Sequence, residues 1–119
     1  MKYTINVNPM GKPSIRVTRR GAFFSNKYNN YRQFIMLDKS YKHIPKLINT
    51  LQVKYFIEMP KSWSAKKKAE MINTPHMSKP DLSNLNKGLE DIVFQEDMQI
   101  HTHICSKYWS DKGRIEIDI

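Results

Sequence analysis

The sequence LQVKYFIEM, residues 51–59, decides the fold. Its β-branched and aromatic residues, closed by Pro60, predict a central β-strand. Working outward, apolar and polar residues alternate over residues 3–7, 100–108 and 115–119. This period of two predicts three further strands, each with one buried face.

Three other segments have the apolar spacing of helices. We expect a helix over residues 25–41 with Ser25 or Asn26 as its cap, a short basic helix over residues 65–70, and a helix that Ser83 or Asn84 opens and that runs to about Phe94. Residues 15–20 predict a short strand or extended arm with a basic end. The order of elements favours an α+β fold, a mixed or antiparallel sheet flanked by helices. With 119 residues, the chain is expected to form one domain, residues 1–119.

The chain is strongly basic, with 20 Lys and Arg against 11 Asp and Glu and a net charge of +9. Such an excess favours a polyanionic partner, because each phosphate contact releases condensed counterions. The alternative is that the charge only aids solubility. The single cysteine, Cys105, indicates a reducing compartment, and we find neither a secretory signal nor an apolar run long enough to span a membrane. We therefore expect a cytoplasmic protein with no membrane partner and no small-molecule cofactor.

Two acidic residues occupy places that suit a metal site. Asp81 lies in a loop just before a predicted helix, and Asp97 lies in a turn just before a predicted strand. One or two carboxylates plus a substrate phosphate can hold Mg²⁺, which prefers hard oxygen ligands and keeps several waters. The alternative is structural: Asp81 as a helix cap and Asp97 as a turn residue. The residues alone leave both interpretations open.

The segment around these acids resembles the RusA family of Holliday-junction resolvases. The resemblance is dense over residues 79–107, where the family pattern is approximately KPDxDNLxKxxxDxL, then DDxQV, then a later lysine. The matching residues here are Lys79-Pro80-Asp81-Leu82-Ser83-Asn84-Leu85-Asn86-Lys87, Glu90-Asp91, Glu96-Asp97-Met98-Gln99-Ile100 and Lys107. Nearer the N-terminus, Gly11, Pro13 and Arg16 are similar to the family's early Gly/Pro/Arg segment.

The resemblance implies a homodimeric nuclease that binds four-way DNA junctions and nicks two opposed strands with Mg²⁺ or Mn²⁺. It places the metal-binding acids on Asp81 and Asp97, with Glu96 in place of the other acid of the second pair. It places the catalytic lysine on Lys87, where a lysine can stabilise the charge that develops on the phosphate. The alternative for Lys87 is an ordinary solvated helix lysine. The family is common in phages and prophages, so the host cell's cytoplasm is the expected setting.

Ser83 departs from the family pattern, which usually has a second aspartate at this position. The loss of one carboxylate should weaken metal binding or change its geometry. Positions 83, 87 and 90 share a helix face, with 91 beside them. We therefore predict that Glu90 or Asp91 supports Asp81 and Asp97 as a metal ligand. The rival hypothesis is an inactive or weakened nuclease that still binds branched DNA through charge and shape.

Several basic residues are candidates for phosphate contacts, which position a protein on DNA without reading its sequence. The alternative is a solvated basic surface. The predicted DNA-binding residues are Arg16, Arg19, Arg20, Lys66, Lys67, Lys68, Lys79 and Lys107. Lys107 is also a second candidate for stabilising charge in the reaction.

Three further groups have both a functional and a structural interpretation. His101, His103 and Cys105 alternate along a predicted strand, and we favour partly exposed strand residues over a zinc site, which needs more ligands. Trp63 and Trp109 can pack in the core or stack on unpaired bases, and we favour packing. Phe23-Phe24 beside the basic arm suits a wedge between base pairs, a dimer contact or a core anchor.

Overall fold

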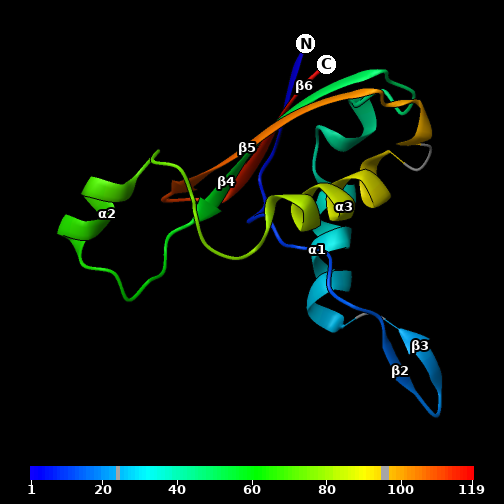
Figure 1. Cartoon of the computed structure of the whole chain (residues 1–119), viewed down its shortest axis with the longest axis horizontal. Coiled ribbons are helices and arrows are strands. Elements are labelled where there is room, and N and C mark those ends of the chain that lie inside the picture. Colours follow the sequence, from blue (N-terminus) through cyan, green and yellow to red (C-terminus); the bar gives the residue numbers. More distant parts are fainter. Residues whose placement is uncertain (24, 95–96) are drawn as a thin grey trace.

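A four-stranded mixed sheet forms the body of the protein. The computed structural model describes all residues except 24, 95 and 96, and all side chains except those three and Arg16, Phe23 and Asp97. The strands are β1 (Lys2–Ile5), β4 (Thr50–Glu58), β5 (Thr102–Ser110) and β6 (Arg114–Asp118), in the order β1-β6-β4-β5. The strand β4 is antiparallel to β6 and parallel to β5, which leaves β5 at an edge (Figure 1).

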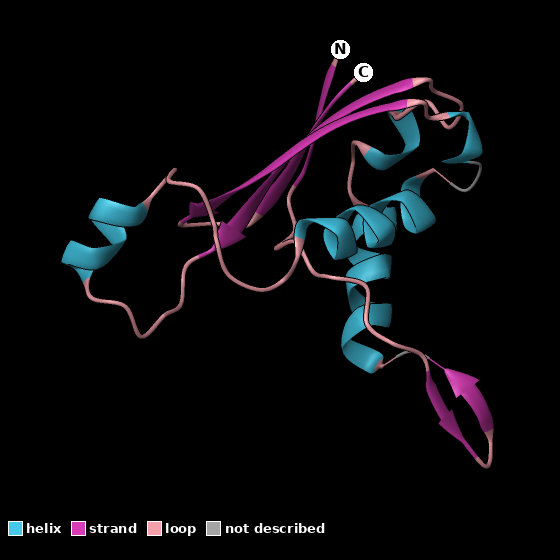
Figure 2. Ribbon diagram, viewed as in Figure 1, coloured by secondary structure: helices cyan, strands magenta, loops and turns pink. Residues whose placement is uncertain are grey.

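Three α-helices and a separate hairpin complete the fold (Figure 2). The helices are α1 (Asn26–Leu37), α2 (Ala65–Met71) and α3 (Leu82–Val93), with short 3-10 turns η1 (Tyr41–His43) and η2 (Asp97–Gln99). The strands β2 (Arg16–Thr18) and β3 (Gly21–Phe23) pair only with each other in the sheet order. Together these elements confirm the α+β class.

The helix starts follow from their capping residues. Ser25 and Ser64 accept hydrogen bonds from the first turns of α1 and α2, which confirms the predicted cap at Ser25. The helix α3 begins at Leu82, not at Ser83 or Asn84 as predicted, because Asp81 already occupies the cap position. The helix α1 ends at Leu37, earlier than predicted, because the Asp38 N–H turns back to the carbonyl of Ile35.

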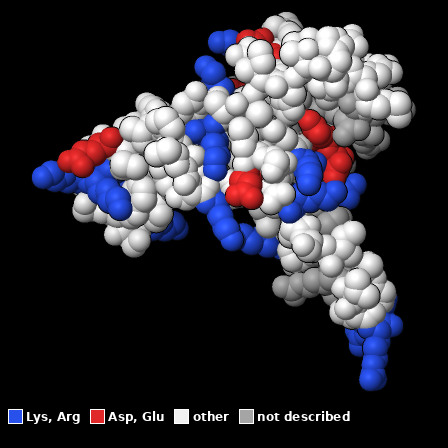
Figure 3. Space-filling model, viewed as in Figure 1, with Lys and Arg blue, Asp and Glu red and all other residues white. Residues whose placement is uncertain are grey.

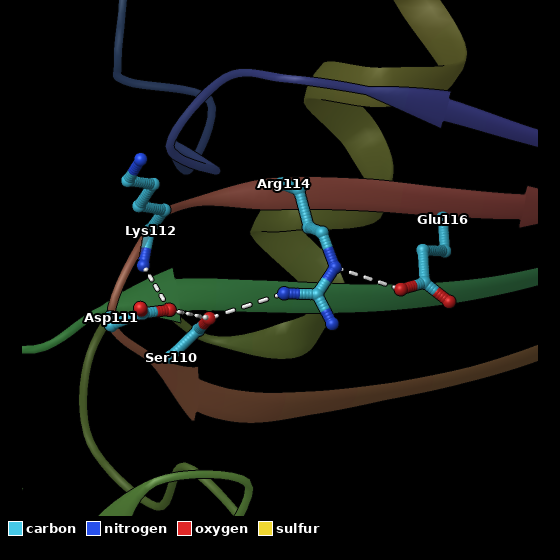
Figure 4. Close-up of polar contacts among 5 residues, drawn as sticks. All are labelled: Ser110, Asp111, Lys112, Arg114 and Glu116. Atoms are coloured by element: carbon cyan, nitrogen blue, oxygen red, sulfur yellow. Dashed lines mark hydrogen bonds and ion pairs between the residues drawn. The ribbon is translucent and has the colours of Figure 1, made fainter.

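One face of the sheet packs against α1 and α3. Alternate residues of β4 and β6 are buried there, and the helices contribute Ile35, Leu85 and Leu89, all fully buried. The opposite face carries polar side chains. On it, Arg114 donates hydrogen bonds to Glu116 Oε2 (2.8 Å) and Ser110 Oγ (3.2 Å) (Figure 4). The Arg114 guanidinium also covers the ring of Phe56, 3.7 Å from its centroid. In β6, buried and half-buried residues therefore alternate, as the sequence pattern predicts, whereas the edge strand β5 is half-buried along most of its length.

The segment that carries α2 returns to the outer edge of β5. Asn73 N–H donates to Trp109 O, Trp109 N–H donates to Thr74 O, and His76 N–H donates to Lys107 O. Inside this fold-back, Trp109 contacts Trp63 (ring centroids 4.8 Å apart) and the His76 ring (4.1 Å). The predicted packing role of Trp63 and Trp109 is confirmed, since both belong to the core or pack against it.

We predict that stability falls at mildly acidic pH through His76. Its side chain is 3% exposed, burial lowers its pKa from 6.5, and the positive charge of Lys107 lowers it further. The folded protein therefore holds His76 neutral while the unfolded chain binds a proton below about pH 6.5, so stability decreases as the pH falls through that value. Urea unfolding followed by tryptophan fluorescence should give a lower free energy of unfolding at pH 5.5 than at pH 7.5.

The variant His76→Gln should show a smaller decrease over the same pH interval. His43→Gln is the matched control, since His43 is an exposed histidine on η1. An equal pH dependence in wild type and His76→Gln would contradict the prediction.

Candidate active site

The helix α3 and the strand β5 run antiparallel, side by side, and polar contacts join them along their length. Residues two apart on β5 point to the same face, and residues four apart on α3 do likewise. The contacts are His103 Nδ1 with Glu90 Oε1 (3.0 Å), Asn86 Nδ2 with Cys105 Sγ (3.1 Å), and Lys107 Nζ with Pro80 O (2.8 Å). Lys107 also donates to Ser78 O at 2.6 Å. We call this row of contacts between α3 and β5 the polar ladder. It fixes the loop before α3 to the second half of β5.

Asp81 lies where this loop becomes α3, at the mouth of an open pocket. Its backbone is extended, and its side chain accepts no capping hydrogen bond from the first turn of the helix. The pocket has a volume of about 440 Å³ and is lined by Gly11, Lys12, Lys79, Pro80, Asp81 and Asn84. A carboxylate at the positive end of a helix, beside two lysines and an amide, is well placed to meet a cation and a phosphate together.

The loop of residues 8–13 forms the other wall of this pocket. Glu58 N–H donates to Asn8 Oδ1 at 2.9 Å, which anchors the loop on β4. Lys12 N–H then donates to Asn84 O at 3.1 Å, which anchors it on α3. A Cβ on Gly11 would approach Pro80 Cβ to 3.0 Å, so the close approach of loop and helix favours glycine here.

Lys12 is a site residue that the sequence analysis missed. It lines the pocket of Asp81, and its Nζ forms an ion pair with Asp91 Oδ2 on α3. The hydrogen bond that Lys12 donates to Asp91 raises the pKa of Lys12 above its ordinary value, so the ammonium is present at neutral pH. The signal available in the sequence was the Gly11-Lys12-Pro13 segment, but its contact with Asp91 joins residues 79 positions apart.

The two acids predicted to support the metal are consecutive, so they point in directions about 100° apart around α3 and contact different partners. Glu90 faces His103 on β5, and Asp91 faces Lys12 on the other flank. Ser83 and Lys87 are exposed on the stripe between them. Glu90 follows Ser83 by seven residues, a rise of about 10 Å along the helix. Within one chain, neither acid lies in the turn of α3 that carries Ser83.

Asp81 and Asp97 belong to opposite ends of α3. Asp81 precedes its first residue, whereas Asp97 opens η2 beyond its last (Figure 1). A 12-residue helix is about 18 Å long. Contacts along β5 show the same separation. Lys107, in the second half of β5, donates to Pro80 O next to Asp81. Gln99 O in η2 accepts from Asn49 Nδ2, close to the start of β5. A single chain thus does not bring these two backbone positions together, and Glu96 lies outside the described residues.

The predicted DNA-binding residues lie on three parts of the surface. Lys and Arg side chains gather on α2 and on the hairpin (Figure 3), and Lys12 and Lys79 line the pocket. Arg19 and Arg20 are exposed at the hairpin turn, and Lys66 and Lys67 are exposed on α2, where Lys67 also lies 4.2 Å from the Trp63 ring. Lys68 is half-buried, and Lys107 donates to loop carbonyls. The backbone of Arg16 lies in β2.

Two further properties of the described residues bear on the site. Among them, no three His, Cys, Asp or Glu side chains gather closely enough to hold a metal ion. None of the helices in the same part of the chain is long and apolar enough to cross a membrane.

A basic α+β protein with an uncapped aspartate in an open, lysine-lined pocket has the features of a protein that acts on nucleic acid. The family comparison gives this class a name: the chain belongs to the RusA family of endodeoxyribonucleases, whose model matches residues 6–119. The resemblance predicted from residues 79–107 is therefore confirmed across nearly the whole chain. The chain is also similar to the uncharacterized protein YqaN of Bacillus subtilis (strain 168). The two are 31% identical over 135 residues, covering all of this chain and 94% of YqaN.

We predict that Lys107 holds the start of α3 in place. In Lys107→Met the carbonyls of Ser78 and Pro80 lose their charged donor, which should loosen the loop and the first turn of the helix. Amide hydrogen exchange of Asn84 and Leu85, which both bond to Asp81 O, should accelerate roughly tenfold, the effect of about 1.4 kcal/mol from a charged hydrogen bond. Exchange in β6 should stay unchanged.

Lys112→Met is the control, because Lys112 is an exposed lysine in the turn between β5 and β6. Unchanged exchange at Asn84 and Leu85 in Lys107→Met would show that the start of α3 does not depend on the hydrogen bonds of Lys107.

Proposed function

We propose that the protein is a Mg²⁺-dependent, structure-selective endonuclease that resolves four-way DNA junctions by paired nicking, with Mn²⁺ as a possible substitute metal. The observation that carries this proposal is the carboxylate of Asp81, left uncapped at the N-terminus of α3 in a pocket it shares with Lys12 and Lys79. Membership of the RusA family supports the reaction class. We place the activity in the cytoplasm of a bacterial cell or a phage-infected host.

The donor atoms in the pocket fit Mg²⁺. Asp81 offers a carboxylate and Asn84 an amide oxygen, both hard ligands from the pocket lining. A bound Mg²⁺ would activate a water and neutralise charge at the scissile phosphate. Around it, Lys12 and Lys79 would bind and orient the phosphate, and Lys87, exposed on the outward stripe of α3, would stabilise charge on it.

We further propose that the complete site forms between two copies of the chain. Because Asp81 and Asp97 belong to opposite ends of α3, one copy would supply Asp81 and the other Asp97. In a two-fold symmetric dimer with antiparallel α3 helices, the start of α3 in each copy would lie beside the end of α3 in the other copy. Two identical sites would result. Such a pair of sites suits the near two-fold symmetry of a four-way junction and makes paired nicking a geometric consequence.

The same arrangement bears on Ser83. Glu90 and Asp91 lie toward the C-terminal part of α3, as Asp97 does, so a second copy that supplies Asp97 brings these acids toward Ser83 of the first. In this way either acid could replace the missing family aspartate, a role that the sequence analysis assigned to them from helix spacing within one chain. The contacts of Glu90 with His103 and of Asp91 with Lys12 would have to adjust. These existing contacts favour the alternative function, a non-catalytic protein that binds branched DNA.

The first test is cleavage of a synthetic four-way junction. We expect paired nicks in the junction with Mg²⁺, none with EDTA, and none in a linear duplex. The substitutions Asp81→Asn and Asp97→Asn should each lower cleavage by at least a hundredfold while leaving junction binding, because loss of one metal ligand removes charge stabilisation worth several kcal/mol. Asp111→Asn, which removes an exposed carboxylate from the turn after β5, is the matched control.

Mixing the two inactive variants tests the shared site. After co-refolding of equal amounts, about half of the dimers should carry one of each chain, and each of these has one intact site and one doubly altered site. Activity should return to about a quarter of the wild-type level, as single nicks. A site contained within one chain predicts no recovery. Junction binding without cleavage at any divalent metal would replace the nuclease proposal with the binding alternative.

A further inference from the structure

The β2–β3 hairpin projects from the body of the protein as a narrow arm (Figures 1 and 3). It has only three residues in each strand and pairs with no strand of the main sheet. Its apolar side chains face solvent: Val17 is 81% exposed, and Ile15 just before it is 53% exposed. A lone two-stranded ribbon is marginally stable in water. A partner that covers these apolar side chains would therefore stabilise the arm.

The turn of the arm presents two arginines. Thr18 Oγ1 accepts a hydrogen bond from Arg20 N–H at 3.2 Å, and Gly21 has a φ of +116°, a conformation that favours glycine. These features close the ribbon between Thr18 and Gly21 and leave Arg19 and Arg20 exposed at the turn. The arm thus ends in two positive charges that the local backbone holds in place.

The charge of the surrounding chain identifies the partner as a polyanion. The first 37 residues contain no Asp or Glu but seven basic residues: Lys2, Lys12, Arg16, Arg19, Arg20, Lys27 and Arg32. The first acid is Asp38, after the end of α1. An acidic protein surface could be attracted as well, but DNA is the substrate that the family already implies.

We infer that the arm enters the major groove of one junction arm and reads base edges there. This inference rests on the proposed function, which makes DNA the substrate. Paired strands lie about 4.8 Å apart, and with their side chains such a ribbon fits the major groove, about 12 Å wide, but not the minor groove, about 6 Å wide. The exposed Val17 and its cross-strand partner Ala22 then face thymine methyl groups, and Arg19 and Arg20 reach guanine N7 and O6.

The inference assigns the arm a task different from phosphate binding. Phosphate contacts give affinity without sequence information, whereas contacts with base edges give a sequence preference. The arm is then the element that selects where along a junction the enzyme is placed, and α2 with Lys66 and Lys67 contributes affinity alone.

Removal of the guanine N7 acceptor tests directly whether the arm contacts base edges. We would measure binding of the full-length protein to a four-way junction and to the same junction with 7-deazaguanine, which lacks the N7 acceptor. Wild type should bind the modified junction roughly tenfold more weakly, the discrimination expected of an arginine–guanine pair. The double variant Arg19→Ala/Arg20→Ala should bind both junctions equally. Lys39→Ala/Lys42→Ala removes two exposed charges beyond the other end of α1 and should keep the tenfold difference.

A second variant tests the apolar side of the ribbon. Replacement of thymine by uracil removes only the methyl group, so it should weaken wild-type binding about threefold and leave Val17→Ala unaffected. Circular dichroism melting should show that both arm variants are folded, since the altered side chains are exposed.

The results of these binding experiments distinguish failure of the arm inference from failure of the nuclease proposal. If wild type binds and nicks the junction but tolerates 7-deazaguanine and uracil, the arm inference is wrong and the nuclease proposal stands. If wild type binds no junction, both fail. If Arg19→Ala/Arg20→Ala elutes as a monomer where wild type is a dimer, the arm holds a second copy of the chain, and the groove inference is overturned.

Discussion

The packing of α3 along the edge strand β5 is the constraint on which the site depends. Core residues such as Leu85 and Leu89 hold the helix against the sheet, but apolar contacts alone do not fix how far it slides along the strand. The ladder of Glu90–His103, Asn86–Cys105 and Lys107 with the loop carbonyls sets that position. Because directional contacts define register, Asp81 emerges at a fixed place beside the pocket.

The same constraint separates the two carboxylates that we propose as metal ligands, Asp81 and Asp97. A helix of 12 residues lying straight along β5 must place its two ends about 18 Å apart, and the acids lie just outside those ends. A metal ion needs its ligands within a few ångströms of one another. In the proposed dimer, two antiparallel copies of α3 would bring the start of each helix beside the end of the other. Catalysis would then require the dimer, and a monomer released from DNA would be inert.

Local features of this fold could be predicted from the sequence, and long-range ones could not. The strand of residues 51–59 and the cap at Ser25 follow from side-chain chemistry that acts over a few residues, and they agree with Thr50–Glu58 and the α1 start. The local sequence also placed Asp81 correctly in a loop before a helix. The parallel pairing of β4 with β5 and the Lys12–Asp91 ion pair join distant segments, and no local pattern encodes them. The hairpin was predicted as a single extended segment, because its closing turn, Thr18 to Gly21, lacks the usual Asn-Gly signal.

The Lys12–Asp91 pair gives Asp91 a task that does not require contact with the metal. Lys12 lies in the pocket of Asp81, and an ammonium there would compete with a cation for that carboxylate. Asp91 binds this ammonium from the flank of α3 and raises its pKa, so Lys12 stays charged and is paired with a carboxylate other than Asp81. In the proposed site, the pocket would keep a positive wall for phosphate while its one described carboxylate, Asp81, would stay available to a metal. In a chain with nearly twice as many basic as acidic residues, the position of each acid decides where a cation can bind.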